Sequence, residues 1–456
     1  MADQTGGGHS RRRHQPAVPD APLHRSIRSW PWAPWLLASM VLLRLVAVVG
    51  IHLYRYFDSA EYDIVDFTGR SRRPWATPLF YALLPDDPRA MIVTQALLGA
   101  VAWTVLALTA AAWFRHRHIQ IGVAVTIAMV GLTTSVTNWD TTKLSESLAL
   151  SLTMLVLAAW LNLVRRPALG AAALLLAVSL PWVFVRQSLM PTVWILVLAA
   201  SIGLVWTWVR RGRRTEAWRA LAVVVAGLAL LCGVATVSYT RNQEIVRHNL
   251  TVIVMNRMAP DAERLQWFED QGMPLPASGG RSFDDFDQDR NFQRWVADEG
   301  SGTYLRFLIA HPWYTATEPL DDFVYARPSY QDEILPQTAM LSPGEGYGSA
   351  RPVIPESLEQ ILFGPGQTGV VLIGLFAVTA WSLVRWRWIG RRWIVPLSAA
   401  LLAVAGLYAA WHGATPELPR LAVVPAVVLR IALVLQIAVL AEGELARRSP
   451  VAKSGS

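Results

Sequence analysis

Acidic and basic side chains gather in one 33-residue segment, 55–87, which separates two long apolar runs. Asp58 follows the first run directly. Apolar surroundings and neighbouring charges tune a carboxyl group there, and its carboxylate is able to take the proton of an acceptor hydroxyl. Glu61 lies three residues further on. Two interpretations stay open: general-base catalysis, or a helix cap at Asp58 followed by Glu61 on a solvated face.

A basic pair in the same segment suits a phosphate. Arg72 and Arg73 stand in SRRPWATPLFYALL, and an arginine binds a phosphate with two parallel hydrogen bonds. The alternative is that both arginines pair with Asp63 or Asp66 nearby. The segment therefore predicts either an anionic substrate or a loop stabilised by its own ion pairs.

A second group of charges lies in NWDTTKLSESLALSL, at the start of another apolar run. Asp140, Lys143 and Glu146 belong to it, and Glu146 enters the predicted membrane span. Ionisable groups at membrane depth are costly and mark functional sites. The alternative is an ordinary helix start, in which Ser145 is the cap and Glu146 favours the helix dipole.

Isolated charges at later turns complete the candidates. Arg186, in VFVRQSLMP, is a lone cation at an outer turn, and a lipid phosphate is one candidate partner. The turn WHGATPELPRLAVVP adds three residues, His412, Glu417 and Arg420. Arg44 and Arg430 lie within apolar runs, and we expect them to pair inside a helical bundle or to reach its surface rather than to touch a substrate.

The composition indicates that these residues are positioned by a membrane bundle. Hydrophobic residues make up 53% of the chain and charged residues 16%, against roughly a quarter charged in soluble domains. Because a spanning helix needs about 20 mostly apolar residues, we expect an all-α polytopic membrane protein with a bundle of about ten transmembrane helices. Apolar runs lie near 32–54, 90–114, 119–135, 146–164, 167–184, 189–209, 220–239, 367–386, 394–411 and 420–441.

Arginine clusters set the predicted orientation, because short basic loops stay cytoplasmic. Counted from an inside N-terminus, every basic cluster falls on one side, including RRGRR at 210–214 and RWRWIGRR at 385–392. The net charge of +8 is then a consequence of topology, and no nucleic-acid partner is expected. We predict a multi-pass plasma-membrane protein with both termini cytoplasmic and the active site extracytoplasmic.

This topology divides the chain into five parts. They are a disordered cytosolic tail (1–30), an N-terminal transmembrane bundle (31–239), an extracytoplasmic domain (240–366), C-terminal transmembrane helices (367–442) and a second cytosolic tail (443–456). The segment 240–366 holds 19 acidic residues and ten arginines, and a stretch of that length is expected to fold. Helices are predicted in DAERLQWFEDQGMP, from a cap at Asp261 to Gly272, in NFQRWVADEG, and in GTYLRFLIAHPW, ended by Pro312.

Three short motifs resemble the GT-C glycosyltransferase superfamily, especially bacterial relatives of the protein O-mannosyltransferases and of the lipid A aminoarabinose transferases. They are a DSxxY element (Asp58 to Tyr62), an Arg-Pro-x-x-x-Pro-Leu-Phe segment (Arg73 to Phe80) and a Ser-Glu-Ser-Leu helix opening (Ser145 to Leu148). The motifs cover the first half of the chain and the layout covers the whole. The chain departs from protein mannosyltransferases, which carry an adjacent Asp-Glu pair, and it lacks the WWDYG element of oligosaccharyltransferases.

The resemblance implies a helical bundle with an acidic first outer loop, a polyprenyl-phosphate sugar as donor, and transfer outside the cytoplasm. It implies that Asp58 is the base or a substrate organiser, and that Arg73 and Arg186 face the lipid phosphate. HGATPELPRLAVVP is similar to the element before the last span in some members of the superfamily, which adds Glu417 and Arg420.

We therefore expect an inverting membrane glycosyltransferase that moves a mannose- or arabinose-type sugar from polyprenyl phosphate to an extracytoplasmic glycan, peptide or lipid acceptor, in contact with membrane lipids. The expected catalytic residues are Asp58, Glu61, Asp140 and Glu146, and the expected substrate-binding residues are Tyr62, Arg72, Arg73, Lys143, Arg186, His412, Glu417 and Arg420. The sequence has no nucleotide-binding or zinc motif, so no cofactor is assigned, while the carboxylates of the first outer loop leave a divalent metal open. Two alternatives remain: a lipid or solute transporter or flippase, with acids at mid-membrane, and a non-catalytic envelope-assembly protein.

Overall fold

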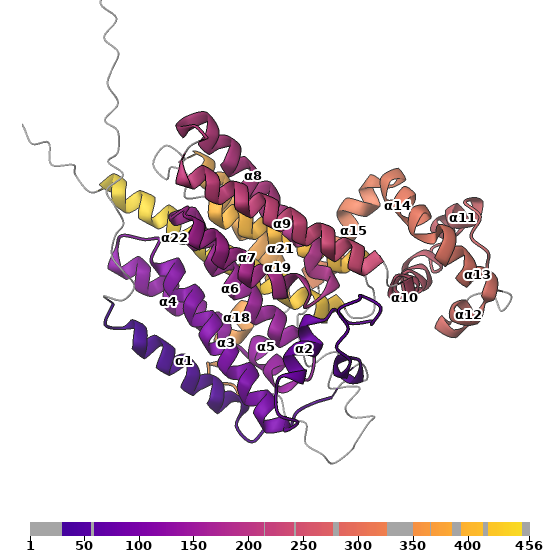
Figure 1. The fold of residues 1–456 in the computed structure, drawn as a ribbon, viewed down its shortest axis with the longest axis horizontal. Coiled ribbons are helices and arrows are strands. Elements are labelled where there is room, and N and C mark those ends of the chain that lie inside the picture. The colour runs from indigo at the N-terminus through magenta and orange to yellow at the C-terminus, as the bar shows by residue number, and fades with distance from the viewer. Residues whose placement is uncertain are drawn as a thin grey trace, which may run out of the picture.

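The computed structural model describes residues 30–55, 59–213, 215–240, 243–276, 282–325, 350–364, 366–384, 394–413 and 418–448. These residues are mainly helical and form no strand, apart from an isolated parallel bridge between Tyr54 and Thr142. They build a helical bundle with a smaller helical domain at one end (Figure 1).

The bundle consists of long apolar helices. They are α1 (Ala33–Val48), α3 (Pro88–Ala111), α4 (Arg117–Gly131), α6 (Glu146–Arg165), α7 (Leu169–Val183), α8 (Met190–Arg211), α9 (Glu216–Thr240), α19 (Gln367–Val384), α21 (Ile394–Gly413) and α22 (Leu418–Arg448). Short elements connect them at one end: η2 (Ser59–Asp63), α2 (Ala76–Ala82), α5 (Thr134–Thr137), η3 (Asn138–Thr141) and η4 (Gln187–Leu189).

Seven of the described helices are long and apolar enough to cross a membrane: α3, α6, α8, α9, α19, α21 and α22. The pair of α4 with α5 and η3, bent by 55° at its break, would make an eighth. Two further helices, α1 and α7, are apolar but have only 16 and 15 residues. The fold is therefore that of an all-α, multi-pass membrane protein, and the expected count of about ten spans is not confirmed.

Local sequence explains where the second long helix begins. Asp87 accepts hydrogen bonds from the backbone N–H groups of Arg89 (3.1 Å) and Ala90 (3.2 Å), and Pro88 occupies the first helical position. Both features are favoured at a helix start. The aspartate accepts hydrogen bonds from N–H groups that have no partner within the helix, and the proline has no N–H group that needs one. The helix then runs for 24 residues to Ala111.

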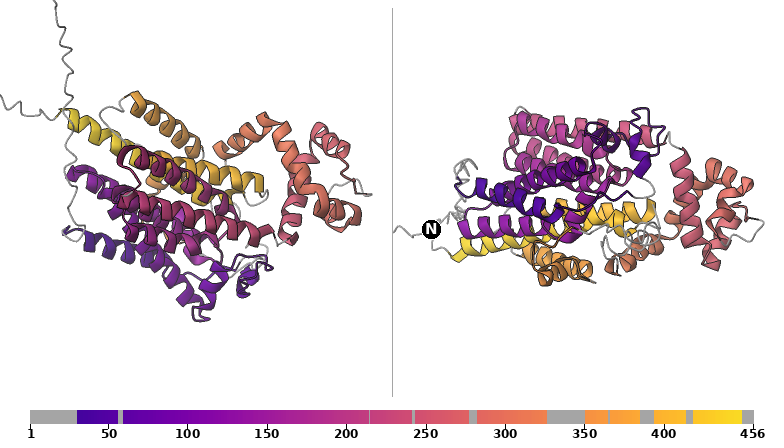
Figure 2. Two further views of the ribbon diagram at one scale, coloured as in Figure 1. Left: turned by 45° about the horizontal axis from the view of Figure 1, so that its top comes forward. Right: turned by 90° about the horizontal axis from the view of Figure 1, so that it is seen from below.

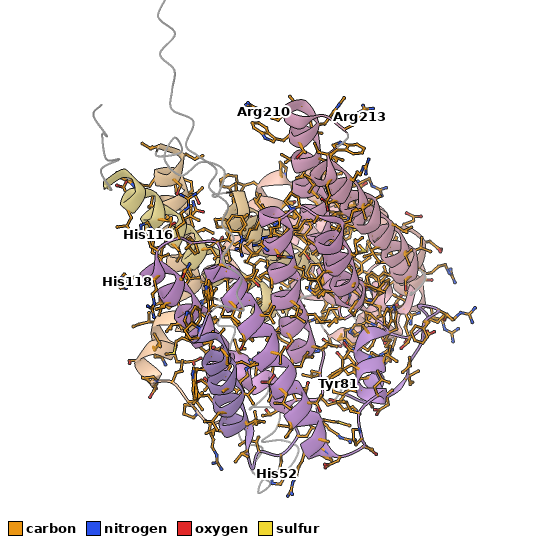
Figure 3. All side chains as sticks on the ribbon, turned by 60° about the vertical axis from the view of Figure 1, so that its left-hand side comes forward. His52, Tyr81, His116, His118, Arg210 and Arg213 are labelled. Carbon is orange, nitrogen blue, oxygen red and sulfur yellow. The ribbon has the colours of Figure 1, made fainter. Side chains whose placement is uncertain are left out.

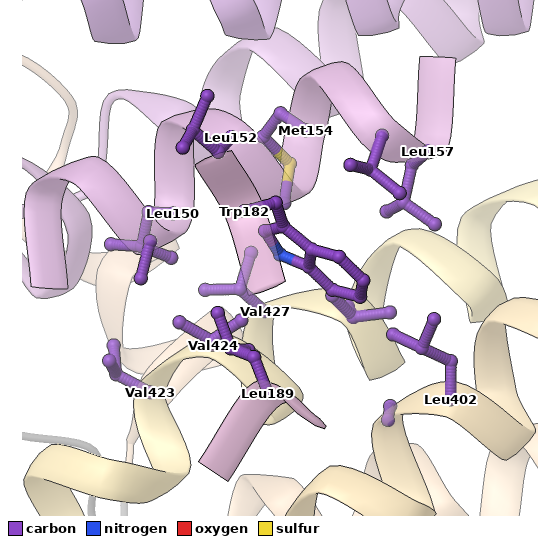
Figure 4. Packing of buried hydrophobic residues seen from close by; sticks show 14 of the residues in the cluster. Leu150, Leu152, Met154, Leu157, Trp182, Leu189, Leu402, Val423, Val424 and Val427 are labelled. Carbon is purple, nitrogen blue, oxygen red and sulfur yellow. The ribbon is translucent and has the colours of Figure 1, made fainter. Parts of the chain in front are cut away.

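Helix α6 lies at the centre of the bundle. In its apolar stretch 83% of the residues are buried, against 28%, 33% and 28% in α8, α9 and α19, as expected of helices that face lipid. α3 packs against α1, α4 and α6, and α21 packs against α22 and α8. Figure 4 shows part of this core, in which Trp182 lies among Met154, Leu402 and Val424.

The two ends of the bundle differ in their loops. Figure 3 shows His52 and Tyr81 toward one end and Arg210 and Arg213 at the other. The first described residues of α1 and the last of α22 lie away from the smaller domain (Figure 2). This arrangement agrees with the predicted separation of basic turns from the first outer loop, and the side of the membrane on which each end lies stays a prediction.

The smaller domain is a cluster of short helices around aromatic side chains. It comprises α10 (Gln243–Ile253), η5 (Val254–Met258), α11 (Ala262–Asp270), α12 (Phe283–Gln288), α13 (Arg290–Trp295), η6 (Val296–Gly300) and α14 (Ser301–Ala310), and α15 (Pro312–Tyr325) joins it to the bundle. Phe268, Phe292 and Phe307 are fully buried in it. The aromatic burial gives this acidic segment a core of its own, as expected for a folded outer domain.

The three helices predicted for this domain are present. Asp261 caps α11 by accepting from the N–H groups of Glu263 (3.1 Å) and Arg264 (3.0 Å), and Gly272 follows with a φ of +87°. α13 and η6 cover the second predicted helix. α14 ends at Ala310, directly before the residue that precedes Pro312, as predicted, and Pro312 then opens α15, since proline is tolerated in the first turn of a helix.

Residues 350–364 lie against the bundle rather than within the helical cluster. The helix α18 (Glu356–Phe363) packs on α5 and α19. Glu359 accepts hydrogen bonds from the backbone N–H groups of Thr134 (2.8 Å) and Ser135 (3.0 Å) and so caps α5 from more than 200 residues away. The predicted outer segment 240–366 thus contributes both a separate domain and a brace on the bundle.

Candidate functional site

A run of buried polar side chains leads into α6. From Asn138 to Ser147 every residue is at most 3% exposed, and the run includes Asp140, Lys143 and Glu146. Buried polar groups cost free energy unless they find partners. We call this run, residues 138–147, the Ser-Glu-Ser corner. The partners of its side chains indicate its function.

Glu146 is the meeting point of three segments that are distant in sequence. Its Oε1 lies 3.2 Å from Nη2 of Arg186, in the turn between α7 and α8, and it accepts a hydrogen bond from Nε of Arg420, at the start of α22. Its Oε2 accepts from the hydroxyl of Ser145 at 3.5 Å, and the Tyr62 hydroxyl of η2 donates to Ser145 at 3.4 Å. The structure thus brings together the first outer loop, the Ser-Glu-Ser corner and the last turn.

The same contacts revise two interpretations of the sequence. Ser145 precedes α6 but its side chain does not cap it, since the hydroxyl is engaged by Tyr62 and Glu146 instead. Arg186 is not an isolated cation, because Glu146 is its partner. Two guanidinium groups share one carboxylate, so this buried cluster carries an excess of positive charge.

Asp140 forms a second buried ion pair on the other side of α6. Its Oδ2 lies 3.2 Å from Nη1 of Arg44 in α1, and its Oδ1 accepts from the Ser147 hydroxyl at 2.7 Å. Arg44 also donates to the carbonyl of Gly131 at 3.0 Å, and it passes so close to Gly99 that a Cβ there would lie 1.4 Å from Nη1. As expected, Arg44 pairs inside the bundle, where it fixes the bend between α4 and α5.

The first outer loop is held against this corner by backbone and side-chain bonds. The Tyr54 N–H donates to the carbonyl of Thr141 (2.8 Å), and the Lys143 N–H donates to the carbonyl of Tyr54 (3.0 Å). The Ser59 hydroxyl donates to the Lys143 carbonyl at 2.9 Å, and the Lys143 ammonium pairs with Asp63. Asp58 itself lies outside the described residues. Its neighbour Ser59 is held at this corner by its hydrogen bond to Lys143.

A more exposed set of ion pairs covers the loop. Arg73 donates from Nε to Glu61 at 2.6 Å, and its guanidinium lies 5.2 Å from the ring centre of Tyr62. Arg72 lies 3.3 Å from Glu61 and also pairs with Glu244 of α10. Arg72 and Arg73 therefore form ion pairs within the protein, as the alternative interpretation predicted. Their partners are Glu61 and Glu244 and not the predicted Asp63 or Asp66.

An apolar pocket opens beside the buried cluster, between the α7–α8 turn and the helices α21 and α22. It is narrow, with a cavity volume of about 10 Å³ for a water-sized sphere, so its walls have to move apart to admit a larger group. Arg186 lines it together with Trp182, Leu189, Leu402, Val424 and other apolar residues, several of which Figure 4 labels. Nη1 of Arg186 is buried and makes no hydrogen bond to any described residue. This pocket combines an apolar wall with the side chain of Arg186, whose Nη1 has no partner among the described residues.

A polar pocket lies on the other side of the same turn. Asp66, Arg73, Trp75, Gln187 and Tyr239 line it with neighbouring residues, and its empty volume is about 250 Å³ with its mouth included. Asp66 shapes the loop around it. Hydrogen bonds from the Thr68 hydroxyl and from backbone N–H groups lower the pKa of Asp66 to about 2. Arg186 and Gln187 are consecutive residues, so one short turn separates an apolar pocket from a polar one.

The last turn divides between two places rather than forming one patch. Arg420 reaches Glu146, whereas His412 contacts the smaller domain, through the carbonyl of Thr315 (3.2 Å) and the Tyr304 hydroxyl (3.4 Å). Glu417 lies outside the described residues. His412 therefore joins the outer domain to α21 and lies apart from the described contacts of Glu146.

Three side chains important for the corner carry no signal in the sequence. The Tyr81 hydroxyl donates to the Leu144 carbonyl at 2.7 Å, and burial raises the pKa of Tyr81, so that it stays a neutral donor. The Gln95 amide donates to the carbonyls of Asp140 (3.0 Å) and Thr142 (3.1 Å). Trp182 closes the wall of the apolar pocket. Each belongs to an ordinary helical stretch, and only the tertiary arrangement reveals its contacts.

The described residues contain no group of three or more His, Cys, Asp or Glu side chains placed to hold a metal ion. Of the candidate carboxylates among them, Glu61, Asp63, Asp140 and Glu146 each have an arginine or lysine as partner. Their surroundings favour an anionic ligand over a cationic one.

Comparison of the sequence with protein-family models and with curated proteins yields no match. The functional argument accordingly depends on the site itself.

Proposed function

We propose that this protein is an inverting membrane glycosyltransferase, which moves a mannose- or arabinose-type sugar from polyprenyl phosphate to an extracytoplasmic acceptor. One observation carries the proposal: Arg186 and Arg420 share the single carboxylate of Glu146 at the edge of an apolar pocket. A polyprenyl phosphate combines an apolar chain with an anionic head, which are the two properties that this arrangement is able to bind.

In this proposal Glu146 organises the arginines instead of acting as a base. Its Oε1 is engaged by both guanidinium groups and its Oε2 by Ser145, and Glu146 does not line the apolar pocket. Arg186, with its unused Nη1, is the group that binds the donor phosphate. Asp140 is likewise held by Arg44 and Ser147, so its part is to position the corner.

The chemistry requires one base and one stabilised leaving group. Asp58 would take the proton of the acceptor hydroxyl as its oxygen forms a bond to the anomeric carbon of the sugar. The bond from that carbon to the phosphate oxygen breaks with its electron pair, and polyprenyl phosphate departs. Arginines placed at the departing phosphate stabilise the charge that develops on it.

The test measures sugar transfer and donor binding separately. Membranes containing wild type, Arg186→Gln, Asp58→Asn or Arg89→Ala receive radiolabelled polyprenyl-phosphate sugars. Arg89→Ala is the matched control, because it also removes one arginine at the same end of the bundle, where Arg89 is exposed. We expect Arg186→Gln to lose binding and transfer, and Asp58→Asn to lose transfer alone.

Two outcomes would overturn parts of this proposal. Equal transfer by wild type and Asp58→Asn would remove Asp58 from the mechanism. Binding of the lipid without transfer of any sugar by wild type would favour a lipid transporter or flippase, for which the ion pairs buried among the helices are also suitable.

A further inference from the structure

The helices α14 and α15 expose an apolar face on the smaller domain. Leu305, Ile309, Trp313 and Leu320 are 58%, 71%, 80% and 40% exposed. Leu305 and Ile309 are four residues apart in α14, so they lie on one face of that helix, and Trp313 continues the series at the start of α15. Large apolar side chains in such a series indicate an interaction surface rather than scattered exposure.

The opposite face of the same helices already packs into the domain. Phe307 and Tyr314 are buried among the aromatic residues of the domain core. The two helices are therefore apolar on both sides, which a helix between a core and water would not be. The surface facing away from the core needs a second apolar environment.

Charge is unevenly distributed over this domain. The exposed side of α11 carries Glu263, Gln266 and Glu269, as expected for a helix in water. The exposed side of α14 carries a single charge, Arg306, and the acidic residue Asp321 lies beyond the apolar series in α15. From Ser301 to Trp313 this face has no acidic side chain, whereas Glu318 and Asp321 stand beside Leu320 in α15. Its α14 end therefore favours contact with an apolar or anionic surface.

The position of this face beside the lipid-facing helices indicates what it contacts. α15 packs on α19 and α21, and the Tyr408 hydroxyl of α21 donates to the Ala316 carbonyl at 2.5 Å. α19 exposes Ile373 and Phe376 at 72% and 77%, as a lipid-facing helix does. Figures 1 and 2 show α15 beside the end of the bundle and α14 leading from it toward the other helices of the domain. The apolar surface of α19 is continuous with an element that carries the α14–α15 face.

We infer that the α14–α15 face, defined by Leu305, Ile309, Trp313 and Leu320, lies in the interface of the lipid bilayer and fixes the smaller domain to the membrane surface. A tryptophan ring is favoured at the level of the headgroups, and Arg306 is able to extend toward lipid phosphates. An amphipathic helix lying in the interface buries its apolar side to a shallow depth and needs no protein partner. This inference does not depend on the glycosyltransferase proposal.

Site-directed spin labelling of the full chain in lipid nanodiscs tests the inference. Cys232 is the only cysteine and is buried in α9, so wild type serves as the unlabelled blank. Nitroxides are attached at Leu305→Cys, Ile309→Cys and Trp313→Cys, and at Gln266→Cys as the control on the water-facing side of α11. Collision with oxygen, which partitions into lipid, is compared with collision with a water-soluble nickel chelate.

The face and the control should behave in opposite ways. Labels at positions 305, 309 and 313 are expected to lose most of their collisions with the nickel chelate while they still collide with oxygen, whereas the label at position 266 collides freely with the chelate. Labels on the face that are as accessible to the chelate as position 266 would overturn the inference. Labels shielded from both reagents would also overturn it, because protein and not lipid would then cover the face.

Discussion

Two sets of arginine–carboxylate contacts lie close together at the same end of the bundle, and they differ chiefly in exposure. In the first outer loop, Arg73 lies 2.6 Å from Glu61, whose side chain is 28% exposed, and Arg72 is 49% exposed. In the buried cluster, Arg420 and Glu146 are 1% and 0% exposed. The residue types are the same, but water screens the first set and not the second.

This difference assigns different parts to the two sets. Exposed pairs contribute little to stability, so the outer loop is able to exchange its partners for a substrate at small cost. In the buried cluster two arginines share one carboxylate, so one positive charge has no counter-charge of its own, which is costly in a buried place. The buried cluster is therefore preorganised for an anion, and the loop is the adaptable part of the site.

Removal of the shared carboxylate should have the largest effect on stability. Glu146→Gln leaves two buried guanidinium groups without a counter-charge, which costs about 3–5 kcal/mol. The melting temperature of the purified protein in detergent should fall steeply, and that of Glu61→Gln, the exposed counterpart, should hardly change. Equal melting temperatures for Glu146→Gln and wild type would show that the cluster is not a buried ion-pair site.

The second buried pair should show strong coupling. Arg44→Met alone leaves Asp140 buried and unpaired, at a cost of about 3–5 kcal/mol, while Arg44→Met with Asp140→Leu removes both charges and should recover much of that loss. Thermal unfolding of the two single variants and the double variant forms a double-mutant cycle. Additive losses would contradict a direct interaction between these side chains.

Arg186→Gln should separate binding from stability. Glu146 keeps Arg420 as a partner in this variant, so the melting temperature should change less than in Glu146→Gln. A lost hydrogen bond between charged groups weakens binding by about 1.5–3 kcal/mol, or roughly ten- to hundred-fold in affinity for polyprenyl phosphate. Titration of the lipid into nanodisc-embedded variants measures this, and unchanged affinity would place the phosphate elsewhere.

Arg72→Ala should cost less than about 1 kcal/mol, because its pairs with Glu61 and Glu244 are largely exposed. The effect should shrink as salt is raised, since salt screens exposed charges. Melting temperatures of wild type and variant at low and high salt measure it. A large, salt-independent loss would indicate that the loop is as rigid as the buried cluster.

Strong acid should loosen the first outer loop through the protonation of Asp66. The pKa of Asp66 is about 2 in the folded protein and about 3.9 in an unfolded chain. Because the folded value is the lower one, Asp66 stabilises the loop above about pH 4, and this contribution is lost as the pH falls toward 2. As the pH falls from about 4 to 2, the rate of hydrogen exchange in segment 66–73 of the wild type should approach the rate in Asp66→Asn. A constant difference between them down to pH 2 would contradict the assignment.

The layout of the chain could be read from its sequence because it follows from hydropathy and charge. Apolar runs of membrane length and the cap at Asp261 are local features, and the structure has long apolar helices and that cap. The basic turn predicted at 385–392 lies outside the described residues. The number of spans could not be fixed in this way. α1, α7 and the bent α4–α5 region are apolar, but their length depends on packing and on a break near Leu132 that no composition signal marks.

The candidate site was only partly readable for the same reason. Sequence indicated that Glu146 is an ionisable group entering an apolar run and that Arg186 is a lone cation at an outer turn, and it assigned Arg420 to the last outer turn. It could not show that one carboxylate satisfies both arginines, because 40 and 274 residues separate them along the chain. Gln95 and Tyr81 were missed entirely, since their bonds go to backbone carbonyls that only the folded corner presents.

The most direct test of the account is an electron cryomicroscopy map of the protein in nanodiscs with polyprenyl monophosphate added. The account predicts phosphate density within hydrogen-bond distance of Nη1 of Arg186 and chain density in the apolar pocket between the α7–α8 turn and the helices α21 and α22. Phosphate density away from Arg186 and Arg420, with that pocket empty of lipid, would contradict it.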